Sequence, residues 1–427
     1  MTAPWLGVIA DDVTGACDVA GGIAETGVRT SIVLGVPEGA DDPAGGPDEC
    51  IVVGLKIRTV PAAEAVGAAR AAAAWLRGRG TGQIYQKYCS TFDSTDSGNI
   101  GPIADALAES IGGMTLGTPA TPAVRRTQYF GHLFVGDRLL SESPMRDHPL
   151  TPMRDSDLVA VLGRQTAGAV ALLPLTVVRS APGSIADGIR ARLAAGARHL
   201  LVDAIEDSDL DRVAEALEQV RTPLVLGGGA GLAVALARRA ARGPAAGAAG
   251  EVPHGGRLIL SGSGSARTRE QVAAFPGRVM TLDPLRIAEE GVSSLLQALR
   301  EALAAAPGES PLVSATAEPD RVREVQATLG VQRAAELVES ALGEIAVAAV
   351  RELGVRRIVV AGGETSGATV AALGMRRLSV GAIAAPGVPW TTGSASAVPG
   401  APTVALLLKS GNFGSPDLFT TAWETAP

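Results

Sequence analysis

The chain has 427 residues, of which 46% are hydrophobic and 19% are charged, and this composition supports large apolar cores and opposes global disorder. Its net charge of −7 and pI near 5.3 oppose nucleic acid or an anionic membrane as the main partner, because both require basic patches. No apolar run approaches the ~20 residues that span a bilayer, and Cys17, Cys50 and Cys89 show no metal-ligand spacing. These features predict a soluble cytoplasmic protein.

Short apolar runs alternate with longer helical patterns in the first part of the chain, which is typical of parallel α/β sheets. The clearest helical pattern covers residues 62–77, where Pro61 suits the first helical position. The strands predicted in this part are residues 5–10, 30–34, 51–55, 84–88, 199–203 and 223–226.

The alternation is interrupted once, by a stretch of glycine, alanine and proline from Ala240 to Gly256 that predicts an inter-domain linker. Length alone suggests two or three domains. We therefore predict an α/β fold class with two α/β domains of mainly parallel sheet, a first domain at residues 1–240 and a second at 256–427.

The second domain repeats the strand–helix pattern. Its longest predicted helix covers residues 332–353, with an apolar stripe at Leu337, Ala341, Ile345 and Ala349. The strands predicted here are residues 257–260, 312–315, 356–361, 380–384 and 403–408.

Two carboxylates follow the first predicted strand, in the run from Ala10 to Ala16 that contains Asp11, Asp12 and Gly15. Ligands of open α/β sheets bind at the carboxyl ends of strands. There the pair could bind substrate hydroxyls, hold a metal or act as a general base. The alternative is that Asp12 only caps the next helix.

The segment from Tyr85 to Pro102 collects a lysine, two carboxylates and several hydroxyl groups in one short run. Such groups must find partners when they are buried, so an apolar core does not explain them. A hydroxylated, anionic small molecule would use them, whereas the alternative is a solvated loop. Lys87 could neutralise a substrate carboxylate, and Asp93 could accept a proton from an attacking hydroxyl.

Residues 123–165 differ from their surroundings because polar residues and prolines interrupt the strand–helix pattern. Within a compact domain such a stretch is usually functional or mobile. His148 lies in it, between Asp147 and Pro149, and could bind a carboxylate or remain a loop histidine.

Three glycine-rich turns follow predicted strands of the second domain, at residues 261–266, 361–368 and 409–414. Small residues at such turns bring backbone N–H groups close to a phosphate at a helix N-terminus. Together the three turns favour a phosphate or nucleotide site.

Neither of two common nucleotide signatures is present. The chain has no Gly-x-x-x-x-Gly-Lys-[Ser/Thr] loop. The run from Gly227 to Ala233 lacks the spacing of a dinucleotide fingerprint, so we expect it to serve close helix–sheet packing or a domain-interface turn.

Taken together, these segments resemble the four-carbon acid sugar kinase family. The resemblance covers essentially the whole chain and rests on residues 11–16, 98–101 and 362–367. Within the family the chain looks most like the 3-oxo-tetronate kinases, because of residues 87–102, 133–137 and 141–153.

The resemblance implies a first domain that binds a sugar acid, a second that binds ATP, and ATP-dependent phosphorylation of the terminal 4-hydroxyl of 3-oxo-tetronate. Mg²⁺ would bridge the phosphates, and its protein ligands are not assigned. Closure of the two domains would bring the substrates together. The ATP contacts that it implies are Ser261, Gly362, Gly363, Glu364, Thr365 and Gly411.

For the acid, the same reasoning implies contacts from Asp11, Asp12, Lys87, Ser94, Asn99 and His148. The base that deprotonates the attacking hydroxyl would be Asp12 or Asp93. Either Asp93 or Cys89 corresponds to the aspartate of the shorter motif in threonate and erythronate kinases, depending on where the gap is placed.

Other functions stay open. A sister kinase would act on threonate, erythronate or 3-oxo-isoapionate, and a non-catalytic sensor would bind ATP and a sugar acid without turnover. The missing fingerprint disfavours a nicotinamide-dependent oxidoreductase. The expected partners are therefore a four-carbon sugar acid and ATP, with neither nucleic acid nor membrane, and the composition permits a homodimer.

Overall fold

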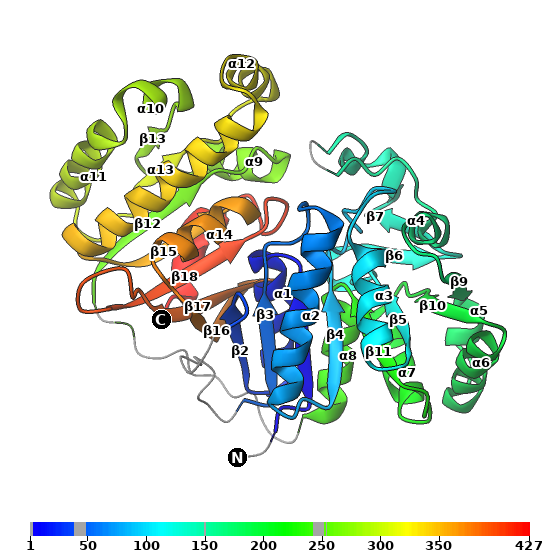
Figure 1. The fold of residues 1–427 in the computed structure, drawn as a ribbon. Helices are drawn as coiled ribbons and strands as arrows, with labels where there is room; N and C mark the ends of the chain where they lie inside the picture. The colour runs from blue at the N-terminus through cyan, green and yellow to red at the C-terminus, as the bar shows by residue number, and fades with distance from the viewer. Residues whose placement is uncertain (1–2, 38–47, 149–150, 242–251, 253) are drawn as a thin grey trace. The chain divides into compact units, whose positions relative to one another are not determined.

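The computed structural model describes residues 3–37, 48–148, 151–241, 252 and 254–427. The chain forms two compact units, Met1–Ala246 and Gly247–Pro427. Both are α/β with mainly parallel sheets, which confirms the predicted fold class (Figure 1). Most of the predicted linker, residues 242–251 and 253, lies outside the described residues.

The first unit is built on a sheet with the strand order β2-β3-β1-β4-β11-β5-β10-β9, in which all neighbouring strands are parallel. Its strands are β1 (Leu6–Ala10), β2 (Thr30–Leu34), β3 (Cys50–Gly54), β4 (Gln83–Lys87), β5 (Met114–Thr118), β9 (Ala169–Leu173), β10 (Ala197–Val202) and β11 (Leu224–Gly228). A small antiparallel sheet contains β6 (Arg126–Tyr129), β7 (His132–Val135) and β8 (Arg138–Leu139).

Helices cover both faces of this sheet. They are α1 (Val13–Glu25), α2 (Ala62–Gly78), α3 (Ile100–Ser110), α4 (Leu158–Gln165), α5 (Leu175–Val178), α6 (Pro182–Ala194), α7 (Asp207–Leu217) and α8 (Ala230–Ala240). Short 3-10 helices lie at Pro122–Val124, Leu140–Glu142 and Pro144–Asp147.

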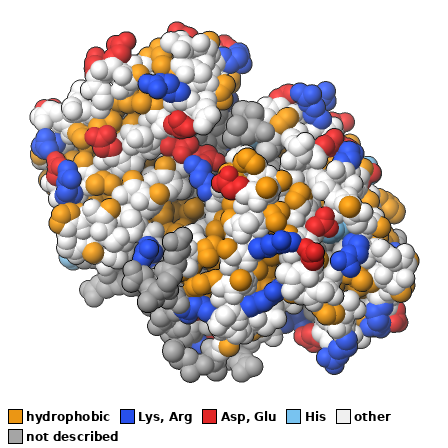
Figure 2. Space-filling view, in the orientation of Figure 1, with side chains coloured by type: hydrophobic (Ala, Val, Ile, Leu, Met, Phe, Trp, Pro, Cys, Tyr) orange, Lys and Arg blue, Asp and Glu red, His pale blue; other side chains and the backbone are white. Residues whose placement is uncertain are grey.

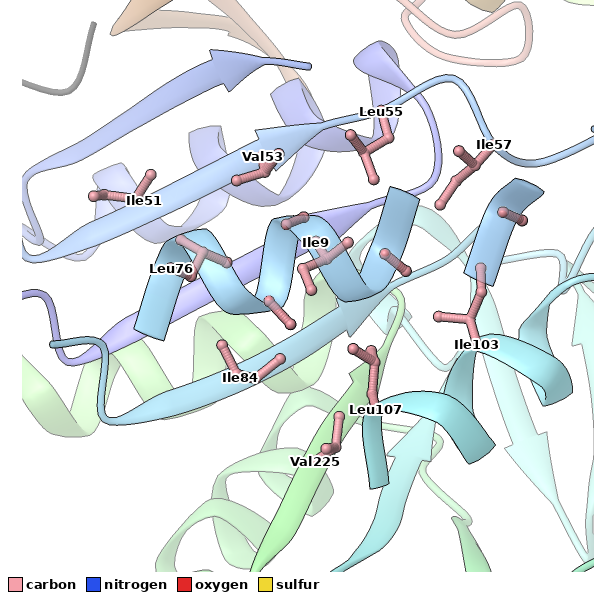
Figure 3. Close-up of a cluster of buried hydrophobic side chains, with 14 of the residues drawn as sticks. Ile9, Ile51, Val53, Leu55, Ile57, Leu76, Ile84, Ile103, Leu107 and Val225 are labelled. Atoms are coloured by element: carbon pink, nitrogen blue, oxygen red, sulfur yellow. The ribbon is translucent and has the colours of Figure 1, made fainter. Parts of the chain in front are cut away.

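A large apolar core fixes α2 and α3 on one face of the sheet. Ile9, Val53 and Ile84 of three neighbouring strands meet Leu76 of α2 and Leu107 of α3 (Figure 3). All five are at most 6% exposed. Burial of a side chain of this size contributes about 1.5–3 kcal/mol. The core therefore holds β1, β3 and β4 in register, and with them the loops at their carboxyl ends.

The second unit has the strand order β13-β14-β12-β15-β18-β17-β16, in which β17 pairs antiparallel with both β16 and β18. Its strands are β12 (Gly256–Ser261), β13 (Val279–Thr281), β14 (Leu312–Ser314), β15 (Val355–Ala361), β16 (Arg377–Ala385), β17 (Val388–Ser394) and β18 (Thr403–Lys409). Its helices are α9 (Ala266–Ala274), α10 (Pro284–Glu290), α11 (Ser293–Ala305), α12 (Pro319–Leu329), α13 (Val331–Glu352), α14 (Gly363–Ala372) and α15 (Leu418–Thr421), followed by a 3-10 helix at Ala422–Thr425.

Most predicted elements agree with the structure within three residues, including the long helix α13, whose Ala341, Ile345 and Ala349 are buried. Pro61 stands one residue before α2, as its N-cap, instead of inside it. The sequence did not predict β5, β9, β13, β17 or the small sheet. These strands are short or lack a strong apolar alternation in sequence. They can be identified only from their pairing with neighbouring strands.

The glycine run from Gly227 to Ala233 allows close packing, which is one of the two roles expected for it. A Cβ on Gly228 would lie 2.0 Å from the Thr118 carbonyl oxygen, and one on Gly231 would lie 2.7 Å from that of Ala120. Only glycine lets these segments approach so closely.

The surface in Figure 2 carries acidic and basic side chains interspersed with apolar ones. Among the described residues, no helix is both long and apolar enough to cross a membrane.

Candidate functional site

Three parallel strands of the first unit end side by side. The register pairs Ala10 of β1 with both Gly54 of β3 and Lys87 of β4. Beyond the strand ends, the Asp11 N–H donates to the Lys87 carbonyl at 3.1 Å and the Ile57 N–H donates to the Asp11 carbonyl at 3.0 Å. The segments that follow the three strands therefore converge, as expected at the carboxyl ends of a parallel sheet.

The guanidinium of Arg58 lies at the centre of this convergence. Its Nε and Nη2 each donate to one oxygen of Asp11 at 2.8 Å, and its Nη1 lies 3.1 Å from Asp12 Oδ2 and 3.9 Å from Asp93 Oδ2. Burial would lower the pKa of Arg58, but Asp11 and Asp12 raise it well above its usual value. Arg58 therefore remains charged and gathers three carboxylates.

The side chain of Asp12 caps helix α1, and both of its oxygens accept hydrogen bonds. Its Oδ1 accepts from the Gly15 N–H at 2.5 Å, and its Oδ2 accepts from Thr14 Oγ1 at 2.8 Å. Burial would raise its pKa, but Arg58, Lys87 and these hydrogen bonds outweigh burial and lower it. A Cβ on Gly15 would lie 2.5 Å from Asp12 Oδ1, which explains the glycine of the motif. Asp12 is thus a stable anion whose oxygens are already engaged.

Asp93 has fewer donors close to its oxygens than Asp11 or Asp12. Its Oδ1 accepts from Thr91 Oγ1 at 2.6 Å, while its Oδ2 lies beyond hydrogen-bonding distance of Arg58. Burial and the neighbouring Asp93 raise the pKa of the Cys89 thiol to about 12. Cys89 is therefore a neutral thiol at physiological pH, so of these two neighbouring side chains only the Asp93 carboxyl group is a candidate base.

Lys87 is 2% exposed and already has a counter-ion. Its Nζ lies 3.4 Å from Asp18 Oδ2 and donates to the Tyr88 carbonyl at 3.1 Å. Burial raises the pKa of Asp18, and Lys87 opposes that shift. This pair joins helix α1 to the end of β4.

Arg126 of β6 is a second guanidinium near these groups. Its Nη1 donates to the Val124 carbonyl at 2.5 Å, and its Nε is buried without a hydrogen bond. Burial lowers the pKa of Arg126, and the nearby carboxylates of Asp93 and Asp18 oppose that shift. In the described part of the chain, no carboxylate lies within 4.0 Å of Arg126.

The predicted substrate residues other than Asp12 and His148 line one pocket. Apart from apolar side chains and Gln86, its lining is Asp11, Arg58, Lys87, Asp93, Ser94 and Asn99. Asn99 Nδ2 donates to the Ile57 and Val60 carbonyls, both at 2.8 Å, and so holds the loop that carries Arg58. The Ser94 hydroxyl accepts from Gln165 Nε2 at 2.8 Å. Charged, hydroxyl and amide groups thus line one concavity together with apolar side chains.

His148 does not line this pocket. Its Nδ1 accepts from the Thr151 N–H at 3.1 Å and lies 3.0 Å from Thr151 Oγ1. The segment around it instead supports the polar run, because Met145 and Met153 share a core with Tyr88 and Phe92. Residues 149 and 150, part of the predicted motif, lie outside the described residues.

The three glycine-rich turns of the second unit also lie side by side. The register pairs Ser261 of β12 with Ala361 of β15, and Ala361 with Lys409 of β18. The Gly262 N–H donates to the Ala361 carbonyl at 3.1 Å, and the Gly362 N–H donates to the Lys409 carbonyl at 3.0 Å. Turns predicted from separate parts of the sequence therefore form one continuous edge.

These turns are packed against each other closely. A Cβ on Gly411 would lie 2.6 Å from Ser263 Oγ, and one on Gly262 would lie 2.2 Å from Thr365 Oγ1. Gly362 has a φ of 124°, a conformation that favours glycine. Gly363 begins α14 and is followed by the exposed Glu364 and the buried Thr365.

Ser261 supports its turn through a contact with Thr316. It is fully buried, and its hydroxyl lies 2.6 Å from Thr316 Oγ1, which donates to the Ser263 carbonyl at 2.9 Å. Helices α9 and α14 begin at these turns, so the positive ends of two helix dipoles lie at the same edge. Backbone N–H groups and hydroxyls in this arrangement fit a phosphate.

Across the described residues, no group of three or more His, Cys, Asp or Glu side chains could hold a metal ion. Asp11, Asp12 and Asp93 instead surround Arg58, whose positive charge occupies the position that a cation would take.

Two family models cover nearly all of the chain. A sugar-binding N-terminal domain matches residues 6–236, and a nucleotide-binding C-terminal domain matches residues 258–419. This chain belongs to the four-carbon acid sugar kinase family. As a member it is a kinase, an enzyme that transfers a phosphoryl group to an alcohol.

Individual relatives extend over the same length. A 3-oxo-tetronate kinase of Cupriavidus necator is 47% identical over 98% of this chain and 96% of its own, and one of Burkholderia multivorans has the same identity and coverage. A solved structure from Salmonella typhimurium LT2 has a TM-score of 0.85 at 37% identity and covers 99% of both chains. One from Haemophilus influenzae has a TM-score of 0.75 at 37% identity, covering 98% of this chain and 99% of its own.

Sequence reasoning missed four charged residues of the two sites, namely Arg58, Asp18, Arg126 and a role for Lys409. A signal existed for Arg58 and Lys409, because each follows a predicted strand as Asp11 follows the first. The others depend on which strands and helices are neighbours.

Proposed function

We propose that this kinase uses ATP to phosphorylate the 4-hydroxyl of 3-oxo-tetronate, giving 3-oxo-tetronate 4-phosphate. The observation that carries the proposal is the identity of 47% to proteins named 3-oxo-tetronate kinase over nearly the full length of both chains. The descriptions of the two family models support an acid site in residues 1–240 and a nucleotide site in residues 256–427.

The acid would bind in the pocket of the first unit. Arg126 is not part of the pocket's lining, but it lies near Asp93 of that lining and is the best candidate for the carboxylate of the acid. This guanidinium has no carboxylate partner among the described residues, whereas Lys87 is paired with Asp18. Ser94, Asp11 and Asn99 would face its hydroxyls from the lining. Asp12 and His148 lie outside that lining, and the assignment of either to the substrate remains a prediction.

Asp93 is the proposed general base. A base needs an oxygen that can approach the attacking hydroxyl, and Asp93 Oδ2 is less engaged than the oxygens of Asp12. The lowered pKa of Asp12 also makes it a weaker base than an ordinary aspartate. Asp12 would instead hold Arg58 and the start of α1 in place, and Arg58 Nη1 lies 3.9 Å from Asp93 Oδ2.

ATP supplies the γ-phosphoryl group that is transferred. The turns at Ser261, at Gly362, Gly363, Glu364 and Thr365, and at Gly411 would hold its phosphates through backbone N–H groups and hydroxyls. Mg²⁺ keeps several waters and uses phosphate oxygens as ligands, so it requires no dedicated cluster of carboxylates. We assign it no protein ligand.

We further propose that the reaction takes place in the cytoplasm. Cys17, Cys50 and Cys89 are free thiols, as is usual in a reducing compartment.

A coupled ADP-release assay with Mg-ATP and a panel of four-carbon acids tests the proposal. We expect turnover with one enantiomer of 3-oxo-tetronate and little with threonate or erythronate. Turnover confined to threonate, erythronate or 3-oxo-isoapionate would replace the substrate. ATP binding without ADP release for any of these acids would favour the sensor alternative.

A further inference from the structure

Lys409 is a buried lysine at the junction of the three turns. It ends strand β18, pairs in register with Ala361, and its carbonyl accepts the Gly362 N–H. Its side chain is 0% exposed. Gly411 follows two residues later, so the ammonium lies directly beneath the candidate phosphate-binding edge.

The ammonium of Lys409 has hydrogen-bond partners but no counter-ion. Its Nζ donates to Thr268 Oγ1 at 2.9 Å and to the Gly411 carbonyl at 3.2 Å, and it lies 6.0 Å from the centre of the Phe419 ring. Within the described ranges, no carboxylate lies within 4.0 Å of this nitrogen. A buried charge of this kind destabilises the protein unless something compensates it.

The charged groups on the surrounding elements do not compensate it. On α9, Arg267 adds positive charge, although it pairs with Glu270 at 2.8 Å. Glu364 on α14 and Asp417 before α15 form no ion pair with Lys409. Burial, and then Arg267, lower the pKa of Lys409 to about 7.

A purely structural role does not explain a lysine at this position. The Gly411 carbonyl already accepts from Ser265 Oγ at 2.6 Å and from Thr268 Oγ1 at 2.9 Å. A third donor adds little to the loop, whereas its charge opposes burial. The same charge becomes favourable when an anion occupies the turns, because opposite charges attract strongly where water is excluded.

We propose that Lys409 is the charge-compensating residue of the nucleotide site, and that an ATP phosphate group at the three turns draws a proton from solvent onto its amine. The inference rests on the proposed function, since it assumes that these turns hold the nucleotide. The proton balance is simple: the neutral amine takes one proton from the buffer and becomes the ammonium, and release of the nucleotide returns it.

The first test measures proton uptake by isothermal titration calorimetry of ATP binding at pH 8, in two buffers of different ionisation enthalpy. Most Lys409 amines are neutral at this pH in the free protein, since their pKa is about 7. We expect ATP binding to wild type to take up nearly one proton more per molecule than ATP binding to Lys409→Met. Proton exchange by ATP itself is the same for both proteins and cancels in this difference. The ATP affinity of wild type should then fall up to about tenfold per pH unit above 7, and that of Lys409→Met should not.

The variant controls separate charge from structure. Lys409→Met keeps the length and apolar stem, so we expect it to weaken ATP binding at pH 7 about tenfold or more and adenosine binding far less. Arg300→Met makes the same change of net charge on exposed α11 and should leave both affinities unchanged. Thermal unfolding of each variant confirms that it is folded.

Equal proton uptake by wild type and Lys409→Met would overturn the inference, and so would equal losses of ATP and adenosine affinity. The pH dependence of wild-type binding needs no variant, so a flat profile from pH 7 to 9 would also overturn it. Failure of wild type to bind ATP at any pH would instead refute the proposed nucleotide site.

Discussion

Both candidate sites lie at the carboxyl ends of parallel strands, but different chemical groups form them. In the first unit, strand ends present ionised side chains, and Arg58 joins Asp11, Asp12 and Asp93. In the second unit, strand ends present backbone groups and hydroxyls, together with the buried amine of Lys409. A site that must deprotonate an alcohol needs a carboxylate, whereas a site for phosphate needs donors and positive charge.

Charge balance differs accordingly. In the first site Arg58 pairs with Asp11 and Asp12, and Lys87 pairs with Asp18, before any ligand binds. In the second site the amine of Lys409 has no carboxylate partner among the described residues. Mutations of the paired carboxylates and Arg58 in the first site should therefore act through stability and catalysis, and mutations in the second site through ligand affinity.

The largest expected effect is on the base. Asp93→Asn should lower kcat by about 10²–10⁴-fold, because the amide cannot accept the proton of the attacking hydroxyl. ATP affinity should be unchanged. Asp96→Asn removes a nearby exposed carboxylate that pairs with Arg164, and it should leave kcat near the wild-type value. Normal turnover by Asp93→Asn in the ADP-release assay would exclude Asp93 as the base.

Arg58→Met tests the charge balance of the first site. It leaves Asp11 and Asp12 without their common counter-ion, so the free energy of unfolding at pH 7 should fall by about 3 kcal/mol. Urea denaturation measures the loss. Arg300→Met breaks an exposed pair with Glu352 and should change it little. Similar losses in the two variants would show that Arg58 does not stabilise the carboxylates.

Arg126→Gln tests recognition of the acid. If Arg126 binds the substrate carboxylate, KM for the acid should rise about ten- to a hundredfold with a smaller change in kcat, as expected for a lost charged hydrogen bond. The neighbouring exposed Arg125 offers the matched control, Arg125→Gln. A change in kcat alone would argue that Arg126 acts on Asp93 and does not bind the carboxylate.

Gly411→Ala tests the packing of the turns in the second site. The added Cβ would lie 2.6 Å from Ser263 Oγ and 3.0 Å from Ser265 Oγ, which must then shift. We expect ATP affinity to fall about tenfold, since a displaced N-cap and turn no longer match the phosphates. Gly67→Ala, with open space around its Cβ position, is the control. Unchanged ATP affinity in Gly411→Ala would remove that turn from the nucleotide site.

The smallest effect concerns acid stability. The pKa of Asp12 is lowered in the folded state, so its contribution to stability is present above the unfolded pKa of about 3.9 and is lost as the pH falls through the folded value. Asp12→Asn keeps a capping side chain and should therefore lose less stability than wild type below pH 4. Parallel acid-denaturation curves for the two proteins would contradict the lowered pKa.

The sequence by itself determined the strand–helix alternation and the places where polar or glycine-rich runs follow strands. Apolar periodicity is a local property, so β1, β3, β4, β12, β15 and β18 were predicted within one residue at each end. Because ligand-binding loops follow the carboxyl ends of parallel strands, the runs at Asp11, Lys87, Gly362 and Gly411 could be chosen without coordinates.

Only the tertiary structure decided which of these runs meet and what their charges do. β1 lies between β3 and β4, and this order brings Arg58 to Asp11 across 47 positions of sequence. Burial, which no local pattern specifies, leaves Lys409 without a counter-ion among the described residues. Strand order and burial arise from packing over the whole unit, and they determine whether a charged side chain is neutralised or remains available to a ligand.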